Sequence, residues 1–158
     1  MAAPHVQTWW REDPDPTAIE ARYGPAVDGA DPTECFIVAR LAEPVGFVQR
    51  YRLEDNPEWQ RSLAVAGTPG DGAGIDYFIG AVTDIGVGLG PEIIGLVVGD
   101  CWTRYPDITA VVVSVAAENR RSWRALEKTG FHRVWSGELI SDDPSDAGNS
   151  HVYLRHRP

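Results

Sequence analysis

Short apolar runs, each bounded by glycine, proline or charged residues, recur along this chain of 158 residues. Runs rich in β-branched and aromatic residues are typical of strands, whereas apolar residues three or four positions apart are typical of helices. This mixture, in a chain of this length, indicates one α/β domain that spans residues 1–158. The pattern predicts strands over residues 34–41, 45–53, 74–80, 108–115, 131–135 and 151–155, and helices over residues 17–23, 91–104 and 119–128.

The segments between these elements carry signals of their own. Thr17 and Glu20 form a capping-box pattern that opens the first predicted helix. The pair Glu43-Pro44 predicts the turn between the first two strands. Residues 54–73 predict a loop of about 20 residues, and a loop of that length in a compact domain is more often functional than idle.

A glycine-rich segment separates the strand at residues 74–80 from the helix that Pro91 begins. Gly86, Gly88 and Gly90 form a tight loop without side chains, and Pro91 suits the first position of a helix. A helix start beside free backbone N–H groups is an anion site, most naturally for phosphate. Pro91 excludes a dinucleotide fingerprint, and the lack of a following Gly-Lys-Ser/Thr excludes a nucleotide triphosphate loop. The segment therefore predicts a pyrophosphate site of another type.

Acidic residues outnumber basic ones, and the formal net charge is −9. Nucleic acid is not an expected partner, because proteins that bind it carry basic patches. The negative charge suits attraction of a cationic substrate, although it also serves solubility. The apolar content of 43% is that of a globular protein, and no apolar run reaches the ~18 residues of a membrane span. The N-terminus has neither the basic segment nor the apolar core of a secretion signal, so we expect a cytoplasmic protein.

The cysteines and histidines give no sign of a metal site. Cys35 and Cys101 lie in a predicted strand and a predicted helix, so we expect two buried thiols rather than a disulfide or a metal pair. The four histidines show no ligand spacing along the chain. We therefore expect no metal.

Asp76 is the most informative single residue. It lies in the third predicted strand, where a carboxylate among apolar residues is costly unless it is paired or takes part in chemistry. An ion pair with Arg50 or Arg52 is one explanation, and a functional role is the other, which we favour. In the neighbouring strand, alternation places Gln49 and Tyr51 on one face, directed to a cleft or to the core.

Three tryptophans are candidates for a binding surface. Trp9 and Trp10 precede a proline-broken segment, and two adjacent side chains cannot both face one core. One of them can therefore flank a cleft, and packing of both at the edge of the domain is the alternative. Trp59 follows acidic residues, which suits an amino sugar, because an aromatic face covers the ring while carboxylates bind ammonium groups. A solvated loop anchored by one tryptophan is the alternative there.

Two motifs, in this order, resemble those of the GNAT acetyltransferases. Residues 85–90 are similar to the acyl-CoA loop of that superfamily, Gln/Arg-x-x-Gly-x-Gly/Ala, with Ile85 in the first position. Residues 118–131 resemble its Asn…Tyr-Glu-Lys-x-Gly-Phe helix. Within the superfamily the chain is most similar to the aminoglycoside 6′-N-acetyltransferases. That similarity rests on Trp9, Trp10, residues 43–51, Trp59, and the sequence Gly74-Ile75-Asp76.

The resemblance implies a mixed α/β fold of the α+β type. Its twisted sheet is mostly antiparallel, with a splayed parallel pair of strands at the centre and helices on both faces. Members of the superfamily begin with a strand and a helix before the position of His5, and this chain has no residues for that first strand. Either a neighbouring chain supplies the edge or the sheet starts one strand late. A monomer or a homodimer is expected.

By resemblance, the cofactor is acetyl-CoA and the substrate is a small cationic amine, the 6′-amine of an aminoglycoside. The pantetheine lies between the splayed strands, and a backbone N–H of the third strand polarises the thioester carbonyl. Asp76 is the implied catalytic residue, which holds the ammonium group and accepts its proton. The implied substrate contacts are Trp10, Gln49, Tyr51, Trp59, Asp76, Ser114 and Asp146. The implied cofactor contacts are Phe78, Ile79, Ile85, Gly86, Val87, Gly88, Leu89, Gly90, Pro91, Asn119 and Ser122.

Two positions depart from the family pattern. Leu126 stands where a tyrosine often protonates the leaving sulfur, and leucine cannot donate a proton. Ser114 stands where aminoglycoside acetyltransferases usually carry an aspartate. We therefore expect weakened activity or another proton donor, with Tyr51 and Tyr77 as candidates. Two further hypotheses are acylation of another amine, such as a siderophore lysine derivative, and a module that binds drug or acyl-CoA without turnover.

Overall fold

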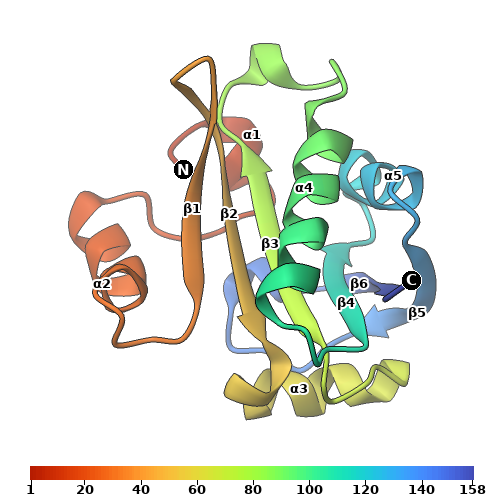
Figure 1. The fold of residues 1–158 in the computed structure, drawn as a ribbon. Coiled ribbons are helices and arrows are strands. Elements are labelled where there is room, and N and C mark those ends of the chain that lie inside the picture. The colour runs from red at the N-terminus through yellow and green to blue at the C-terminus, as the bar shows by residue number, and fades with distance from the viewer.

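The computed structural model describes residues 1–158 and contains one six-stranded sheet with the strand order β1-β2-β3-β4-β6-β5 (Figure 1). Neighbouring strands are antiparallel except β3 and β4, which run parallel at the centre. The sheet is therefore mixed and mostly antiparallel, as the resemblance implies. The strands are β1 (Glu34–Arg40), β2 (Glu43–Arg52), β3 (Ala73–Ile79), β4 (Ala110–Ala116), β5 (His132–Glu138) and β6 (Asn149–His156).

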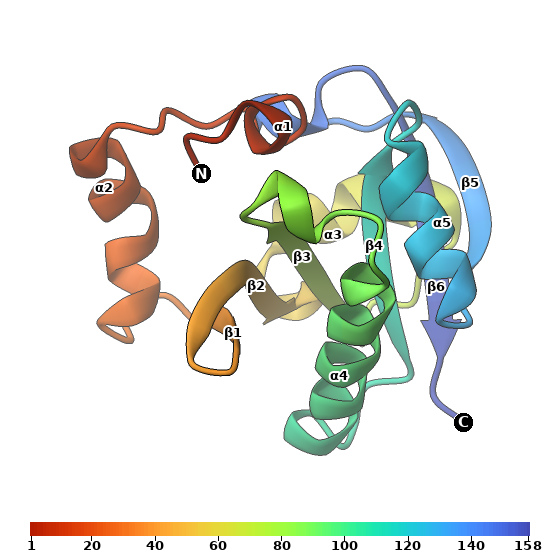
Figure 2. The same cartoon turned by 90° about the horizontal axis from the view of Figure 1, so that it is seen from above.

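Helices lie on both sides of the sheet, as the view from above shows (Figure 2). α4 and α5 pack on one face, α3 packs on the other, and α2 lies beside the edge strand β1. None of them has the length and apolar content that a membrane crossing requires. The helices are α1 (Pro4–Gln7), α2 (Pro16–Val27), α3 (Pro57–Leu63), α4 (Leu89–Arg104) and α5 (Arg120–Lys128), and the 3₁₀ turns are η1 (Leu53–Asp55), η2 (Ala64–Ala66), η3 (Val82–Asp84) and η4 (Pro144–Asp146).

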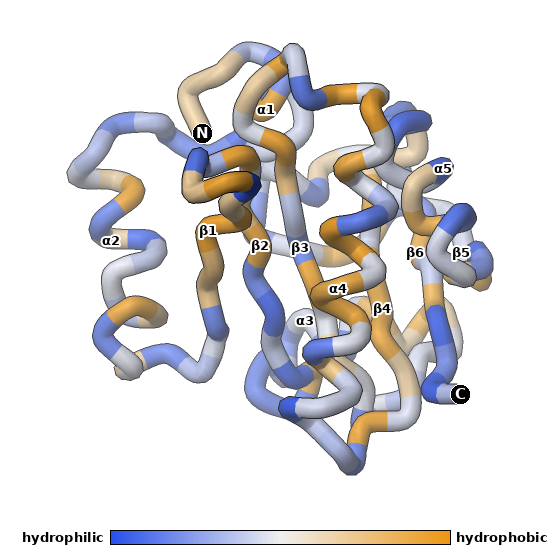
Figure 3. The backbone as a smooth tube through the Cα atoms, turned by 45° about the horizontal axis from the view of Figure 1, so that its top comes forward, coloured by the Kyte–Doolittle hydropathy of each residue, from blue (hydrophilic) through white to orange (hydrophobic).

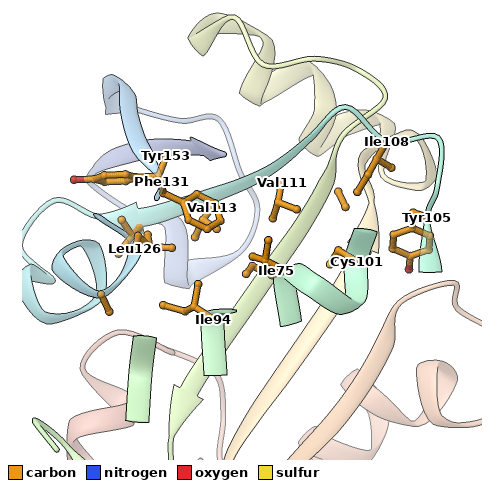
Figure 4. Close-up of a cluster of buried hydrophobic side chains, with 14 residues drawn as sticks. Ile75, Ile94, Cys101, Tyr105, Ile108, Val111, Val113, Leu126, Phe131 and Tyr153 are labelled. Carbon is orange, nitrogen blue, oxygen red and sulfur yellow. The ribbon is translucent and has the colours of Figure 1, made fainter. Parts of the chain in front are cut away.

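The core is built around β4, which is buried on both faces. Val111 and Val113 pack with α4 and α5 in a cluster of 14 buried residues (Figure 4). Val112 points to the other side, where it packs with Leu63 of α3 and Val152 of β6. A strand covered on both faces has a nearly continuous apolar sequence, and Figure 3 shows β4 as an orange stretch of the tube. The valine run therefore predicted this strand, and its burial on both faces explains the run.

β3 and β4 diverge beyond the middle of the sheet. They pair only at Ala73 with Val111 and at Gly74 with Val112. On its other side β3 stays paired with β2 as far as Ile79. The later residues of β3 therefore have no strand partner toward β4, and the splayed central pair expected from the resemblance is present.

Two helices begin at residues other than those predicted. The cap of α2 is Asp15, whose carboxylate accepts a hydrogen bond from the Thr17 backbone N–H (2.8 Å), so Thr17 is not the cap. Aspartate is a strong cap and the proline after it suits the first helical position. α4 begins at Leu89 rather than Pro91, because Gly88, with a φ angle of 94°, already turns the chain into the helix.

The structure also corrects the predicted turn at residues 43–44 and the predicted loop at residues 54–73. β1 and β2 are joined at Leu41 and Ala42, whose φ angles are 51° and 69°. Two successive positive φ angles match the twist of a tight hairpin, so the predicted turn residues Glu43 and Pro44 belong to β2 instead. Residues 54–73 are not a loop, because they contain α3, η2 and most of η1.

The outer strands complete the sheet. β5 and β6 pair as far as Glu138 with Asn149, and both are therefore longer than predicted. β1 forms the opposite edge, with α2 beside it. Within this chain, β1 is therefore the first strand of the sheet.

Candidate active site

A cavity of about 310 Å³ lies where β3 and β4 separate. Its lining comes from β1 to β4, α3, the start of α5, the N-terminal segment with α2, and the η4 region. Cavities of this size are typical of small-ligand sites. The structure brings all of the predicted substrate residues to this cavity, namely Trp10, Gln49, Tyr51, Trp59, Asp76, Ser114 and Asp146.

Asp76 lies opposite Gln49 in the register of β2 and β3, and Gln49 Nε2 donates a hydrogen bond to Asp76 Oδ2 (2.8 Å). Neither candidate arginine reaches it, because Arg50 and Arg52 each form ion pairs with other carboxylates. A structural ion pair therefore does not explain this carboxylate. Its position in the cavity agrees with a functional role.

The electrostatics of the site make Asp76 a base of moderate strength. Its pKa is raised to about 6, mainly by burial and also by the charges of Asp146 and Asp143, against the opposing effect of the Gln49 hydrogen bond. Burial also raises the pKa of Asp146, whose Oδ2 accepts a hydrogen bond from Ser141 Oγ (2.6 Å). Clustered carboxylates favour a bound proton or cation. This end of the cavity can therefore hold an ammonium group and take its proton.

The whole cavity is anionic. Five carboxylates line it against a single guanidinium, that of Arg22. Arg22 is itself paired with Glu12 (3.3 Å) and Asp143 (3.4 Å). Asp76 and Asp146 have no cationic partner in the protein. A cleft of one sign raises the local concentration of ligands of the opposite sign, so the cavity suits a polycation.

Tyr51 and Trp59 form an aromatic wall next to Asp76. Trp59 Nε1 donates to the Tyr51 hydroxyl (3.1 Å), and both rings also pack against the buried cluster beneath α3. The Tyr51 ring lies over Gly74, where any Cβ would come within 2.4 Å of the ring. The glycine in the sequence Gly-Ile-Asp is therefore required so that Tyr51 can reach the cavity.

The N-terminal segment forms another wall of the cavity. Both Trp9 and Trp10 line the cavity. Trp10 Nε1 donates to the Tyr23 hydroxyl (2.9 Å), and its ring packs edge-on against Phe78, with centroids 5.1 Å apart. Arg11 bonds through its backbone N–H and its guanidinium to the η4 region. Phe78, a predicted cofactor contact, is thus a support for Trp10 and does not line the cavity.

Hydroxyl and amide groups line the side formed by β4 and the start of α5. Asn119 Oδ1 caps α5 by accepting from the Ser122 backbone N–H (3.2 Å). Ser122 Oγ and the Tyr77 hydroxyl oxygen are 2.8 Å apart. Ser114 Oγ is buried without a hydrogen-bond partner. A buried polar atom in this state favours a ligand that satisfies it.

The glycine-rich loop lies at the start of α4, outside the lining of the cavity. Gly86 and Gly88 have left-handed φ angles of 84° and 94°. The backbone N–H groups of residues 86–90 have no acceptor in the protein. Free N–H groups beside the positive end of a helix form an anion site. Of the predicted cofactor contacts here, Gly86, Val87, Gly88, Leu89 and Gly90 carry the free N–H groups, whereas the Ile85 N–H bonds to the Val82 carbonyl (3.2 Å) and Pro91 has no N–H.

The edge of β3 connects the loop with the cavity. The Gly80 N–H bonds to the Val45 carbonyl of β2 (2.9 Å), so by alternation the backbone groups of Tyr77 and Ile79 point toward the gap. The Ile79 carbonyl accepts a hydrogen bond from His5 Nε2 (2.9 Å). A free strand edge can bind an extended chain that contains amides. An elongated ligand can therefore run from the loop into the cavity.

Sequence reasoning missed part of the lining. Glu12, Arg22 and Tyr23 reach the cavity only because α2 and the segment before it fold back beside the sheet. No local pattern marks them. Asp143, by contrast, lies in a loop whose several aspartates were a usable signal, although charged loops are usually only solvated.

The cysteines do not form a metal or disulfide site. Cys101 is buried in the core and Cys35 is half-buried, and both are free. Cys35 lines the cavity, so the expectation that both thiols are buried holds only for Cys101. No group of three or more His, Cys, Asp and Glu side chains is arranged to hold a metal ion.

Comparison with protein families gives one match. A family model described as the acetyltransferase (GNAT) domain matches residues 1–139, most of the chain. No curated protein sequence matches at a significant level.

Solved structures of the same fold include acetyltransferases. The aminoglycoside acetyltransferase AAC(6′)-Ib in complex with coenzyme A is similar with a TM-score of 0.80 and 23% identity, over 98% of this chain and 84% of that chain. The same enzyme with paromomycin and acetyl-CoA gives a TM-score of 0.81 and 23% identity, over 99% and 83%. Spermidine N-acetyltransferase from Vibrio cholerae in complex with CoA and spermine gives a TM-score of 0.67 and 16% identity, over 96% of this chain and 82% of that chain. At these identities the similarity establishes the fold alone.

Proposed function

Because this chain belongs to the GNAT acetyltransferase family, we propose that it transfers the acetyl group of acetyl-CoA to the 6′-amine of an aminoglycoside. The observation that carries the proposal is the Asp76 carboxylate. It has no cationic partner and lies in an anionic cavity with aromatic walls, at the point where β3 and β4 separate. The family supplies the reaction class and the cofactor, and the cavity indicates the amine.

The residues present fit acetyl-CoA, which supplies a thioester carbonyl for attack by an amine. The free N–H groups of residues 86–90 are donors suited to a diphosphate. The open edge of β3 offers the backbone groups of Tyr77 and the N–H of Ile79 to an amide-containing arm, since the Ile79 carbonyl already accepts from His5. Asn119 and Ser122 stand at the start of α5, where they can contact the same arm. A backbone N–H of this edge would polarise the thioester carbonyl.

Asp76 would hold the substrate ammonium and accept its proton. An ammonium group cannot attack a carbonyl until it loses a proton, and a carboxylate with a pKa of about 6 is mostly ionised at neutral pH. Gln49 fixes the carboxylate by its hydrogen bond at 2.8 Å. The Asp146 carboxylate, which also has no cationic partner, can hold a second ammonium group of the same substrate.

The cavity favours an amino sugar over the other amines considered. Tyr51, Trp59 and the N-terminal tryptophans present ring faces that can cover a sugar ring. A siderophore lysine derivative carries a carboxylate, which the clustered aspartates would repel. A flexible polyamine shares the positive charge but has no ring to stack. A binding module without turnover stays the alternative, because Leu126 and Ser114 depart from the family pattern.

A panel of amines tests the proposal. We expect acetyl transfer from acetyl-CoA to kanamycin and tobramycin, slower transfer to spermidine, and none to N6-hydroxylysine, which keeps its carboxylate. Because the site is anionic, KM for the aminoglycoside should rise with salt as charges are screened. Thiol release measures the rate, and mass spectrometry with NMR identifies the acetylated nitrogen. Binding of both ligands without product, or acetylation of the lysine derivative alone, would contradict the proposal.

Gly88→Ala tests the phosphate loop. Gly88 has a φ angle of 94°, and a left-handed conformation costs an alanine about 1–2 kcal/mol. If the loop shifts to relieve this strain, we expect the affinity for coenzyme A in titration calorimetry to fall by about tenfold. Gly29→Ala is the matched control, because Gly29 also has a positive φ (75°) and open space around it but lies far along the chain, between α2 and β1. Equal affinities of the two variants would remove the loop from the cofactor site.

A further inference from the structure

The position at which a tyrosine usually protonates the departing sulfur holds no acid in this chain. Leu126, at the position of the family's usual tyrosine, is completely buried in the core cluster between α5 and the sheet. It has no proton to give and no access to the cavity. A group elsewhere must therefore supply the proton if the reaction is to keep its usual rate.

We propose, on the basis of the function proposed above, that the hydroxyl of Tyr77 is the general acid that protonates the sulfur of coenzyme A as it leaves. Tyr77 follows Asp76 directly on β3, and successive strand residues point to opposite faces. Both side chains line the same cavity because it extends through the gap between β3 and β4. The base and the acid therefore stand on opposite sides of the place where the acyl group would lie.

The surroundings of Tyr77 direct its hydroxyl toward the start of α5. The hydroxyl is 2.8 Å from Ser122 Oγ, and Ser122 belongs to the first turn of the helix that Asn119 caps. The Tyr77 ring packs against the same core cluster that contains Leu126. A phenol on β3 thus approaches the region that a phenol at position 126 would serve, but from the sheet instead of the helix.

Tyr51, the other candidate, lies on the wrong side. It shares a face with Gln49, whose amide binds Asp76, and its hydroxyl accepts a hydrogen bond from Trp59. Its ring is fixed over Gly74, on the face of the sheet where the amine would bind. Tyr51 therefore belongs to the amine side of the site, and the acid on the cofactor side is Tyr77.

The proton transfers balance over the reaction. Tyr77 gives its O–H proton to sulfur as the C–S bond breaks and the C–N bond forms, so the electron pair of the broken bond ends on a neutral thiol. Asp76 takes the proton that the nitrogen loses. Tyr77 then regains a proton from solvent through the Ser122 hydroxyl. Burial raises the pKa of Tyr77 above its usual value, against the opposing hydrogen bond of Ser122, so the phenol stays protonated at neutral pH and gives up its proton only as negative charge develops on the sulfur.

Tyr77→Phe removes the proton and keeps the ring. We expect kcat with acetyl-CoA to fall by about 10²–10⁴-fold, the usual contribution of a general acid, with the affinity for acetyl-CoA unchanged. Tyr153→Phe is the matched control. Tyr153 belongs to the same core cluster and its hydroxyl donates to Glu127 (2.9 Å), away from the cavity. An equal loss of kcat in both variants, or no loss in Tyr77→Phe, would overturn the proposal.

A second acyl donor separates acid catalysis from packing. An acetyl ester of thiophenol releases a more stable thiolate, which leaves without a proton. Tyr77→Phe should therefore match the wild type with that donor, while it remains slow with acetyl-CoA. A deficit of the same size with both donors would mean that Tyr77 only shapes the site.

The ionisation of the thiol in bound coenzyme A tests the role of Tyr77 without any turnover. Tyr77 donating to sulfur would stabilise the bound thiolate, so the acid dissociation constant of the thiol in bound coenzyme A should be about tenfold smaller in Tyr77→Phe than in the wild type. Thiolate absorbance across pH measures it. Equal constants would contradict the role of Tyr77. If the wild type binds coenzyme A but acetylates no amine, the proposed function fails while this titration still tests Tyr77.

Discussion

Asp76→Asn is expected to lower kcat/KM for the aminoglycoside by about 10²–10⁴-fold, because asparagine can accept the Gln49 hydrogen bond but cannot take a proton. The pH profile should change as well. The pKa of Asp76 is raised to about 6, so kcat/KM of the wild type should rise with pH through about 6 as the carboxylate ionises. That rise should be missing in Asp76→Asn. The measurement is the initial rate at low amine concentration from pH 5 to pH 8.

The same substitution should stabilise the fold. The pKa of Asp76 is higher in the folded state than the unfolded value near 4, so folding disfavours the charged form and stability decreases as pH rises through about 6. Asp76→Asn should therefore raise the free energy of unfolding above pH 6, with little difference at pH 4. Asp28→Asn is the control, since it removes one charge at an exposed position after α2. For the catalytic prediction, equal values of kcat/KM for Asp76→Asn and the wild type would show that Asp76 takes no part in the mechanism.

Gly74→Ala is expected to destabilise the fold and to distort the aromatic wall of the cavity. The new Cβ would lie 2.4 Å from two atoms of the Tyr51 ring, well inside contact distance. Overpacking of this kind typically costs about 1–3 kcal/mol. Displacement of Tyr51 would also disturb the hydrogen bond from Trp59 and the wall beside Asp76. We expect both a lower denaturant midpoint and a higher KM for the amine.

Two further variants show whether the clash is the cause. In Tyr51→Ala the ring is absent, so Gly74→Ala should cost little when it is added there, and the double-mutant cycle should give a large coupling free energy. Gly95→Ala is the control, because Gly95 is exposed in the interior of α4 with nothing near its Cβ position. It should stabilise the protein by about 0.5–1 kcal/mol. An additive cycle would show that the cost of Gly74→Ala arises elsewhere.

The sequence determined features that depend on neighbouring residues. The valine run of β4, the cap at Asn119 and the left-handed glycines of the glycine-rich loop follow from local sterics, alternation and backbone hydrogen bonding. Boundaries were less certain where two local signals competed. Thr17 was a possible cap, and Asp15 took that place because the proline that follows fixes the start of α2.

The tertiary structure decided which side chains meet. Asp76 could be read from the sequence as costly, but its partner could not, and only the register of β2 against β3 chose Gln49 over two arginines. The roles of Arg22 and Tyr77 likewise depend on how α2 folds beside the sheet and where α5 begins. The reason is physical. Local patterns fix the conformation and the face of each element, whereas the contacts between elements distant in sequence are set by packing of the whole domain.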